Sequence, residues 1–365
     1  MNYFYSHFKK LDKPLILAAV FLAFLGILEL AGMAQNDSVF LAHQNKQIIA
    51  LAVGIFVMFG VSLFDYRFFK NNSYGAILFY AGILILLAVL LVAGEQTRGT
   101  VAWFKIAGFA FAPVEITKIA LVVLLAKYFS GRQAEMYQFF HLIVSFAYVA
   151  LPAVLVLLQP DLGSALVLLS LWLSLVLFSG ISRKQIIIMA LCGILVFTFA
   201  WAGFLKDYQK ERILNVLNPY HDPQGIGYNV IQSMIAIGDG GLSGKGLGYG
   251  SQVQLKFLPE AHTDFMLASI AEELGFISVL AVFSLVLIII WRIIKVAFMA
   301  ENNFARMFCG GMALLIFIQT VINSGMNFGV SPVIGITFPF LSYGGSSLIA
   351  LFFGLGLVQS IKARN

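Results

Sequence analysis

The sequence predicts an all-α protein that crosses a membrane about ten times. Two observations predict this fold class: the composition, and the length of the apolar runs. The 365 residues are 60% hydrophobic and only 11% charged, with a mean hydropathy of +0.92, whereas soluble domains carry about 25% charged residues. A soluble fold of this size could not bury so much apolar surface, so lipid is the expected solvent.

Apolar runs of about 20 residues, the length that crosses ~30 Å of hydrocarbon, recur along the chain. The first run is too long for the core of a cleavable signal peptide, so we expect it to be a membrane helix. A single membrane domain over residues 1–365 is the simplest organisation, with one long polar loop at about 206–262 between the seventh and eighth spans. The predicted spans are 14–34, 47–64, 74–94, 113–130, 139–158, 162–180, 185–205, 263–291, 305–325 and 341–361.

Lysine and arginine predict the orientation, because they are enriched in cytoplasmic loops. With a cytoplasmic N-terminus, every inner loop carries at least two of them, whereas the short outer segments 35–46, 159–161 and 326–340 carry only Lys46. We therefore expect both termini in the cytoplasm. Eight outer cations lie in 95–118 and 206–262, which suits an anionic ligand on the outer face and equally suits a solvated loop beside lipid headgroups.

Charged residues at membrane depth are costly and are candidates for function. Glu115 and Lys118 fall in the first turns of the fourth predicted span, after Pro113. Their i, i+3 spacing allows an ion pair, and the helix dipole favours an anion near the N-terminus. From spacing alone, a structural ion pair and a ligand contact are equally good interpretations.

Asp264 opens the eighth predicted span and is expected near the outer interface. In a continuous helix, Asp264, Ala268, Ala271 and Gly275 share one face. This stripe of small residues predicts either close packing against another helix or a crevice for a lipid chain. Glu272 and Glu273 would lie about 12 Å deeper by helical rise and would need partners that the sequence does not identify.

Other chemistry is less well supported. His262 suggests a Ser-His-Asp relay, but the sequence contains no nucleophile elbow, so a hydrogen-bonded interfacial histidine is favoured. The glycine-rich stretch 239–246 fails the P-loop pattern, although its amides could still wrap a phosphate. No Cys or His set has metal-ligand spacing. The sequence pI near 9.2 is accounted for by inner loops, so nucleic-acid binding is not supported.

Several short motifs follow one another along the chain. They are Ala-Pro-Val-Glu-Ile-Thr-Lys at 112–118, Gln-Pro-Asp-Leu-Gly at 159–163, Arg212 with 225–229, Phe-Leu-Pro-Glu-Ala-His-Thr-Asp-Phe at 257–265, Glu-Glu-Leu-Gly at 272–275 and Ser-Tyr-Gly-Gly-Ser at 342–346. In this order they resemble the SEDS family, which includes RodA, FtsW and SpoVE. Gly-Lys-Gly at 244–246 and the short chain favour its RodA branch over FtsW. Ala-Pro-Val-Glu at 112–115 departs from the family's Gln-Pro-Ser-Glu, so polar roles at 112 and 114 are absent.

The resemblance implies a peptidoglycan glycosyltransferase of the bacterial cytoplasmic membrane. Such an enzyme polymerises lipid II into glycan strands at the outer face during elongation and shape maintenance, with a class B penicillin-binding protein and membrane lipids as partners. Asp264 matches the family's essential carboxylate. The substrate-binding residues implied with it are Glu115, Lys118, Gln159, Asp161, Arg212, Lys245, His262 and Ser342.

The implied reaction has definite chemical needs. A carboxylate within hydrogen-bond reach can deprotonate the acceptor 4-hydroxyl, which assigns Asp264 as the base. Cations must stabilise the leaving lipid pyrophosphate, and Lys118, Arg212 and Lys245 are the candidates. A single displacement inverts the donor's α-linkage to β. No cofactor is expected, although a divalent cation (Mg or Mn) could assist at the pyrophosphate. The alternative function is a transporter, or flippase, of lipid-linked cell-wall precursors, but no internal transporter repeat is visible.

Overall fold

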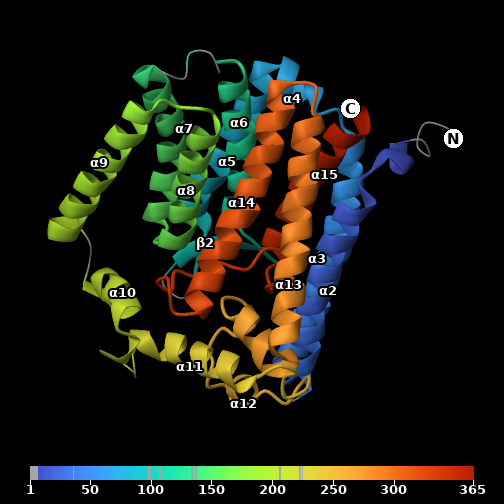
Figure 1. Cartoon of the computed structure of the whole chain (residues 1–365), viewed down its shortest axis with the longest axis vertical. Coiled ribbons are helices and arrows are strands. Elements are labelled where there is room, and N and C mark those ends of the chain that lie inside the picture. The colour runs from blue at the N-terminus through green and yellow to red at the C-terminus, as the bar shows by residue number, and fades with distance from the viewer. Residues whose placement is uncertain are drawn as a thin grey trace.

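The protein is a bundle of long apolar helices with a cap of short helices at one end (Figure 1). Each of the ten predicted spans corresponds to a helix in most of its length. Eight of the helices are long and apolar enough to cross a membrane by length and composition. Of the other two, α8 is shorter and α6 carries Glu115, Lys118 and Lys127. The computed structural model describes residues 7–35, 37–97, 100–106, 109–132, 135, 138–204, 207–221, 223 and 225–365.

The long helices follow the predicted order, with α3 starting nine residues before the predicted span. They are α2 (Lys13–Ala34), α3 (Ser38–Leu63), α5 (Ser73–Ala93), α6 (Pro113–Ser130), α7 (Phe139–Leu158), α8 (Leu162–Phe178), α9 (Arg183–Phe199), α13 (Met266–Met299), α14 (Asn303–Asn327) and α15 (Gly345–Arg364). The shorter elements are α4 (Arg67–Asn71), the π-helix η2 (Ala200–Phe204), α10 (Asp207–Leu217), the 3-10 helix η3 (Pro219–His221), α11 (Ile226–Asp239) and α12 (Ser251–Gln254).

The first described residues of the chain and its C-terminus lie at one end of the bundle, called here the terminal end, and α10–α12 lie at the other, called here the loop end (Figure 1). At the terminal end, Arg292 on α13 forms a 2.6 Å ion pair with Asp12, the N-cap residue of α2. Gln359 on α15 exchanges hydrogen bonds with the backbone of Asp12. The two termini therefore share one side, as the cation pattern predicts, while the cytoplasmic identity of that side stays a prediction.

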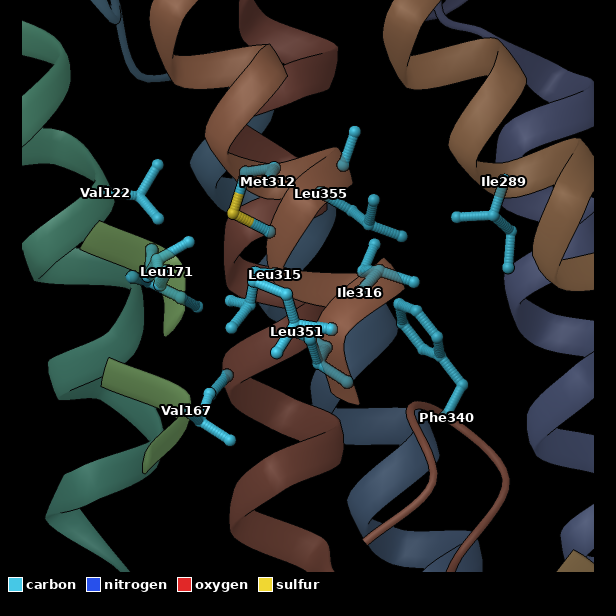
Figure 2. Packing of buried hydrophobic residues seen from close by; sticks show 14 of the residues in the cluster. Val122, Val167, Leu171, Ile289, Met312, Leu315, Ile316, Phe340, Leu351 and Leu355 are labelled. Atoms are coloured by element: carbon cyan, nitrogen blue, oxygen red, sulfur yellow. The ribbon is translucent and has the colours of Figure 1, made fainter. Parts of the chain in front are cut away.

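The core lies around α14 and α15, which are the most buried of the membrane-length helices. Leu315 and Ile316 of α14 lie among Leu351 of α15, Val122 of α6 and Leu171 of α8 (Figure 2). By contrast, none of the apolar window of α9 is buried, and this helix stands apart from the bundle (Figure 1). Its side chains are therefore left for lipid or another apolar surface to cover.

A small antiparallel sheet was not predicted by the all-α assignment. Its strands β1 (Glu95–Thr97), β2 (Thr100–Ile106) and β3 (Phe109–Phe111) are ordered β1-β2-β3 and lie between α5 and α6. Alternation over only three to seven residues is a weak signal beside the flanking apolar runs.

The eighth predicted span is not one continuous helix, which corrects the sequence prediction. Gly275 has φ 77° and ψ −179°, so α13 is broken there. Ser278 Oγ donates to both Gly275 O, at 2.6 Å, and Ile270 O, at 3.3 Å. Eight residues of straight helix would separate Ser278 from Ile270 by about 12 Å. The chain therefore turns back at Gly275, and 266–274 forms a short helix folded against 276–299.

This turn reverses the predicted depth of the acidic residues. Ser269 donates to Glu29 of α2, whereas the Glu273 carboxylate lies against Gly32, nearer the loop end of α2. The short helix therefore runs toward the loop end from Asp264 to Glu273. The expectation that Glu272 and Glu273 lie deeper than Asp264 is wrong, because it assumed a helix that continues inward.

Candidate active site

Asp264 lies in a tight turn directly before α13. The amides of Thr263 and Asp264 donate to Glu260 O at 3.0 and 3.1 Å, and Glu260 has the left-handed φ of 55° that such a turn requires. The Asp264 side chain is half-buried. It is therefore held on a short, rigid turn rather than on a mobile loop.

Two asparagines of α14 hold the backbone of Asp264. Asn323 Nδ2 donates to Asp264 O at 2.9 Å, and Asn327 Nδ2 donates to the same oxygen at 3.0 Å. The sequence analysis missed both residues. The signal was available, because amide side chains at i and i+4 in an apolar helix share one face and polar residues at membrane depth are candidates for function.

The segment 328–344, between α14 and α15, forms a wall beside Asp264. Among the described residues, a Cβ added to Gly335 would meet only Asp264 Oδ2, at 3.7 Å. The backbone at Gly335 therefore passes beside this carboxylate with no side chain between them. Gly335 has φ 73°, a conformation that glycine adopts without strain.

This same segment connects Asp264 to the other motif residues. Tyr343 N donates to His262 O at 2.9 Å. Three residues later, Ser346 Oγ accepts from Ala112 N at 3.0 Å, immediately before α6. Three residues of chain span at most roughly 11 Å. The turn that carries Asp264 and the start of the helix that carries Glu115 and Lys118 are thus held close together.

Glu115 and Lys118 form the predicted ion pair, with Lys118 Nζ 2.8 Å from Glu115 Oε1. The side chains are 4% exposed for Lys118 and 14% for Glu115. A charge this deeply buried needs its partner. The pairing is confirmed, and a further contact with ligand stays a prediction.

Gln159 and Asp161 have local structural partners. Gln159 Nε2 donates to Leu87 O at 3.0 Å, and Asp161 caps α8 by accepting from Ser164 N at 2.9 Å. Their turn still lies beside the site, because a Cβ on Gly163 would be 2.2 Å from Ile334 O. The geometry supports positioning of the 328–344 segment by this turn, and substrate contact by these two side chains stays a prediction.

His262 and Ser342 lie at the other end of this segment. The His262 ring stacks on His43 of α3, with centroids 4.9 Å apart, and the Tyr343 ring lies 4.6 Å from His43. Ser342 Oγ accepts from Phe338 N at 2.9 Å, which closes a turn. Both predicted residues are next to Asp264 through backbone contacts, and their roles toward substrate stay predictions.

Glu272 has the partners that the sequence could not name. Its Oε1 accepts from Lys245 Nζ at 3.1 Å and Gln252 N at 2.9 Å, and its Oε2 accepts from Val253 N at 3.3 Å. Glu272 is fully buried. It therefore ties the outer loop to the short helix of α13.

Glu273 completes this connection, which we call the latch: Glu272, Glu273 and loop 244–254. Glu273 Oε2 accepts from Gly248 N at 2.7 Å, and Glu273 Oε1 accepts from Gln254 Nε2 at 2.9 Å. The amides of Lys245 and Gly246 donate to the backbone carbonyls of Glu272 and Glu273. The glycine-rich loop thus directs these N–H groups to a carboxylate and carbonyls of its own chain.

Lys245 belongs to the latch. Its ammonium donates to Asp239 at 3.0 Å and Ser251 at 2.8 Å as well as to Glu272. Partial burial disfavours the cation, but the hydrogen bonds that Lys245 donates to Asp239 and Glu272 outweigh it and hold the pKa of Lys245 above its ordinary value. This cation is already paired, so a pyrophosphate would have to displace protein ligands.

Arg212 on α10 lines a small pocket of about 10 Å³ with Asn215, Gly329 and Ser331. A pocket of this volume has room for about one water.

The predicted stripe of small residues is closely packed. Ala268 and Ala271 are buried, and a Cβ on Gly240 would be 1.8 Å from Ala271 O. Close packing, the first of the two interpretations, is confirmed for Ala268 and Ala271, whereas Asp264 and Gly275 lie outside the short helix and do not continue the stripe.

Within the described part of the chain, no group of three or more His, Cys, Asp or Glu side chains is arranged to hold a metal ion. A divalent cation at the pyrophosphate stays a prediction.

Comparisons with known proteins show which family the chain resembles. Residues 11–365 match the cell cycle protein family of FtsW, RodA and SpoVE. The chain belongs to this family. Peptidoglycan glycosyltransferase MrdB of Escherichia coli K12 is 35% identical over 317 residues, which cover 87% of this chain and 85% of that protein. A probable peptidoglycan glycosyltransferase FtsW of Geobacter metallireducens is 35% identical over 370 residues, covering 98% and 96%.

Solved structures of the family share the fold. The Thermus thermophilus rod-shape-determining protein RodA has a TM-score of 0.70 at 29% identity, with 96% of each chain covered. A chain of a peptidoglycan synthase complex, described as coordinating polymerization and crosslinking, has a TM-score of 0.81 at 33% identity, with 96% and 97% covered. The predicted SEDS resemblance and the membrane fold are confirmed.

Proposed function

We propose that this family member is a peptidoglycan glycosyltransferase that polymerises lipid II, with Asp264 as the catalytic base. The observation that carries the proposal is a half-buried carboxylate on a hydrogen-bonded turn, beside the side-chain-free Gly335. An acceptor hydroxyl placed within hydrogen-bond reach of this carboxylate can pass its proton to Asp264 as it attacks. The relatives named as peptidoglycan glycosyltransferases support the same activity.

The bond changes follow from the chemistry of the substrates. The acceptor oxygen bonds to the donor's anomeric carbon, the carbon–oxygen bond to the lipid pyrophosphate breaks, and the hydroxyl proton moves to Asp264. One displacement converts the α-linkage to β. Negative charge develops on the leaving pyrophosphate and needs fixed cations. We assign Lys118, Arg212 and Lys245 to this role, with Lys118 held in place by Glu115 and Lys245 by the latch.

The site would face the outside of the bacterial cytoplasmic membrane, with the terminal end in the cytoplasm. A class B penicillin-binding protein is the proposed partner, which the synthase complex among the similar structures supports. Both FtsW and MrdB occur among the relatives. We favour the elongation role, because Gly-Lys-Gly at 244–246 resembles the RodA branch.

The test separates an enzyme from a transporter of lipid-linked precursors. The wild-type protein is purified together with a class B penicillin-binding protein and incubated with labelled lipid II. We expect muramidase-sensitive glycan strands. A second sample, reconstituted in vesicles, is assayed for movement of lipid II between leaflets. Movement without any polymer would contradict the proposal and support the transporter.

A further inference from the structure

Two buried amides on α14 hold the backbone of Asp264 in place. Asn323 and Asn327 are both 0% exposed. Their Nδ2 atoms lie 2.9 and 3.0 Å from Asp264 O. A backbone carbonyl can only accept a hydrogen bond, so the NH2 group of each amide must face it.

Asn323 also bonds the segment that forms the other wall of the site. Its Nδ2 donates its second hydrogen to Ile336 O at 2.7 Å. Ile336 follows Gly335, and a Cβ on Gly335 would lie 3.7 Å from Asp264 Oδ2. One amide group therefore sets the distance between the turn that carries Asp264 and the segment that faces its carboxylate.

Asn327 holds the start of α13. Phe265, the N-cap residue, supplies no side-chain cap, and the first amides of a helix otherwise lack partners. Asn327 Oδ1 accepts from Ala268 N at 3.0 Å while its Nδ2 binds Asp264 O. The same side chain also donates to Asn323 O at 2.8 Å, so the two amides form one connected unit.

We infer that Asn323 and Asn327 are positioning residues for the catalytic carboxylate. This inference rests on the proposed role of Asp264. Polar side chains in membrane proteins often bond one helix to another, but these two bond a non-helical carbonyl at the reacting residue. Burying amides is costly unless every group is paired, and here the donors are used on the two walls of the site. Both act on the reaction only through Asp264.

The test compares variants of α14 in the polymerisation assay. Asn323→Leu keeps the side-chain size and removes both donors. Thr320→Val, one turn earlier, is the matched control, because among the described residues its hydroxyl bonds only Ile316 O of the same helix. A misplacement of about 1 Å can cost roughly 100-fold in rate. We expect kcat of Asn323→Leu to fall by that order with KM for lipid II unchanged, and Thr320→Val to behave as wild type.

A second variant decides the matter if Asn323→Leu does not fold. Asn327→Asp keeps the acceptor for Ala268 N and loses the N–H donor to Asp264 O, until protonation of the new carboxyl restores one donor. We expect a reduced kcat and a ratio of variant to wild-type turnover that rises as the pH is lowered.

The outcomes distinguish the positioning role of Asn323 and Asn327 from the proposed function. Wild-type kcat in Asn323→Leu, or a raised KM with unchanged kcat, would overturn the positioning role. So would wild-type turnover of Asn327→Asp at every pH. Absence of polymer from the wild-type protein would instead contradict the proposed function itself.

Discussion

Lys118 carries its charge almost wholly inside the protein, 2.8 Å from Glu115. If Lys118 also stabilises the leaving pyrophosphate, its role depends on where the cation lies. We expect Lys118→Ala to lower polymerisation by roughly 100- to 1,000-fold, the range for losing one group that stabilises developing charge. Turnover with labelled lipid II, on protein first shown to be folded by thermal unfolding, measures the effect.

The charge-swapped protein, Glu115→Lys with Lys118→Glu, supplies the control for this prediction. It restores the attraction between the two positions but moves the cation by three residues. We expect it to recover stability and not activity. Recovery of most of the activity would show that the pair is only structural.

Residue-scale inference from the sequence succeeded where a single position stands out from its surroundings. Glu115 and Lys118 are charged within an apolar run, and their contact followed from i, i+3 spacing. The partner of Lys245 could not be inferred in this way, because Glu272 lies 27 residues later and no local pattern joins the two residues. The roles of Asn323 and Asn327 depend equally on Asp264, about 60 residues away.

At the scale of elements, the turn at Gly275 decides where the acidic residues lie. A Cβ at Gly275 would be 2.3 Å from Gly244 N, and φ 77° with ψ −179° is a conformation almost restricted to glycine. We expect Gly275→Ala to lower the free energy of unfolding by about 1–3 kcal/mol from backbone strain alone. Because the latch holds the short helix that follows Asp264, polymerisation should fall as well.

Gly193→Ala is the matched control for this substitution. Gly193 lies in the exposed helix α9, and a Cβ there would meet nothing within 4 Å. Alanine is favoured over glycine in a helix by up to about 1 kcal/mol, so the unfolding temperature should stay unchanged or rise. Equal unfolding temperatures for Gly275→Ala and Gly193→Ala would contradict the turn at Gly275.

Hydrophobic length predicted every long helix, since crossing a bilayer imposes about 20 apolar residues. It could not predict the turn inside α13, because 263–291 is apolar on both sides of Gly275 and a glycine in such a run is compatible with a straight helix. The small sheet of β1, β2 and β3 was missed because alternation over three to seven residues is a weak signal. The length of an apolar run reflects the thickness of the membrane, whereas a reversal of the chain depends on contacts such as that of Ser278 with Ile270.

At the scale of the whole molecule, the orientation in the membrane remains to be measured. The two ends of the bundle are separated, with both termini at one end and α10–α12 at the other (Figure 1). We expect a membrane-impermeant thiol reagent, added from outside, to label Gly225→Cys and to miss Arg183→Cys. Exposed Cys192 is first replaced by serine, and Cys309 is buried. The reverse labelling pattern would place the site in the cytoplasm and exclude the proposed function.

The central claim is that Asp264 is the base for polymerisation, and turnover of Asp264→Asn tests it most directly. Asparagine keeps the size of the side chain and removes the proton acceptor, and general-base contributions are typically ~100- to 10,000-fold. Wild-type and variant proteins, each purified with the class B partner, are incubated with labelled lipid II. The account predicts strands from the wild type, a loss of kcat in that range for Asp264→Asn, and lipid II binding that survives. Glycan strands formed by Asp264→Asn at the wild-type rate would contradict it.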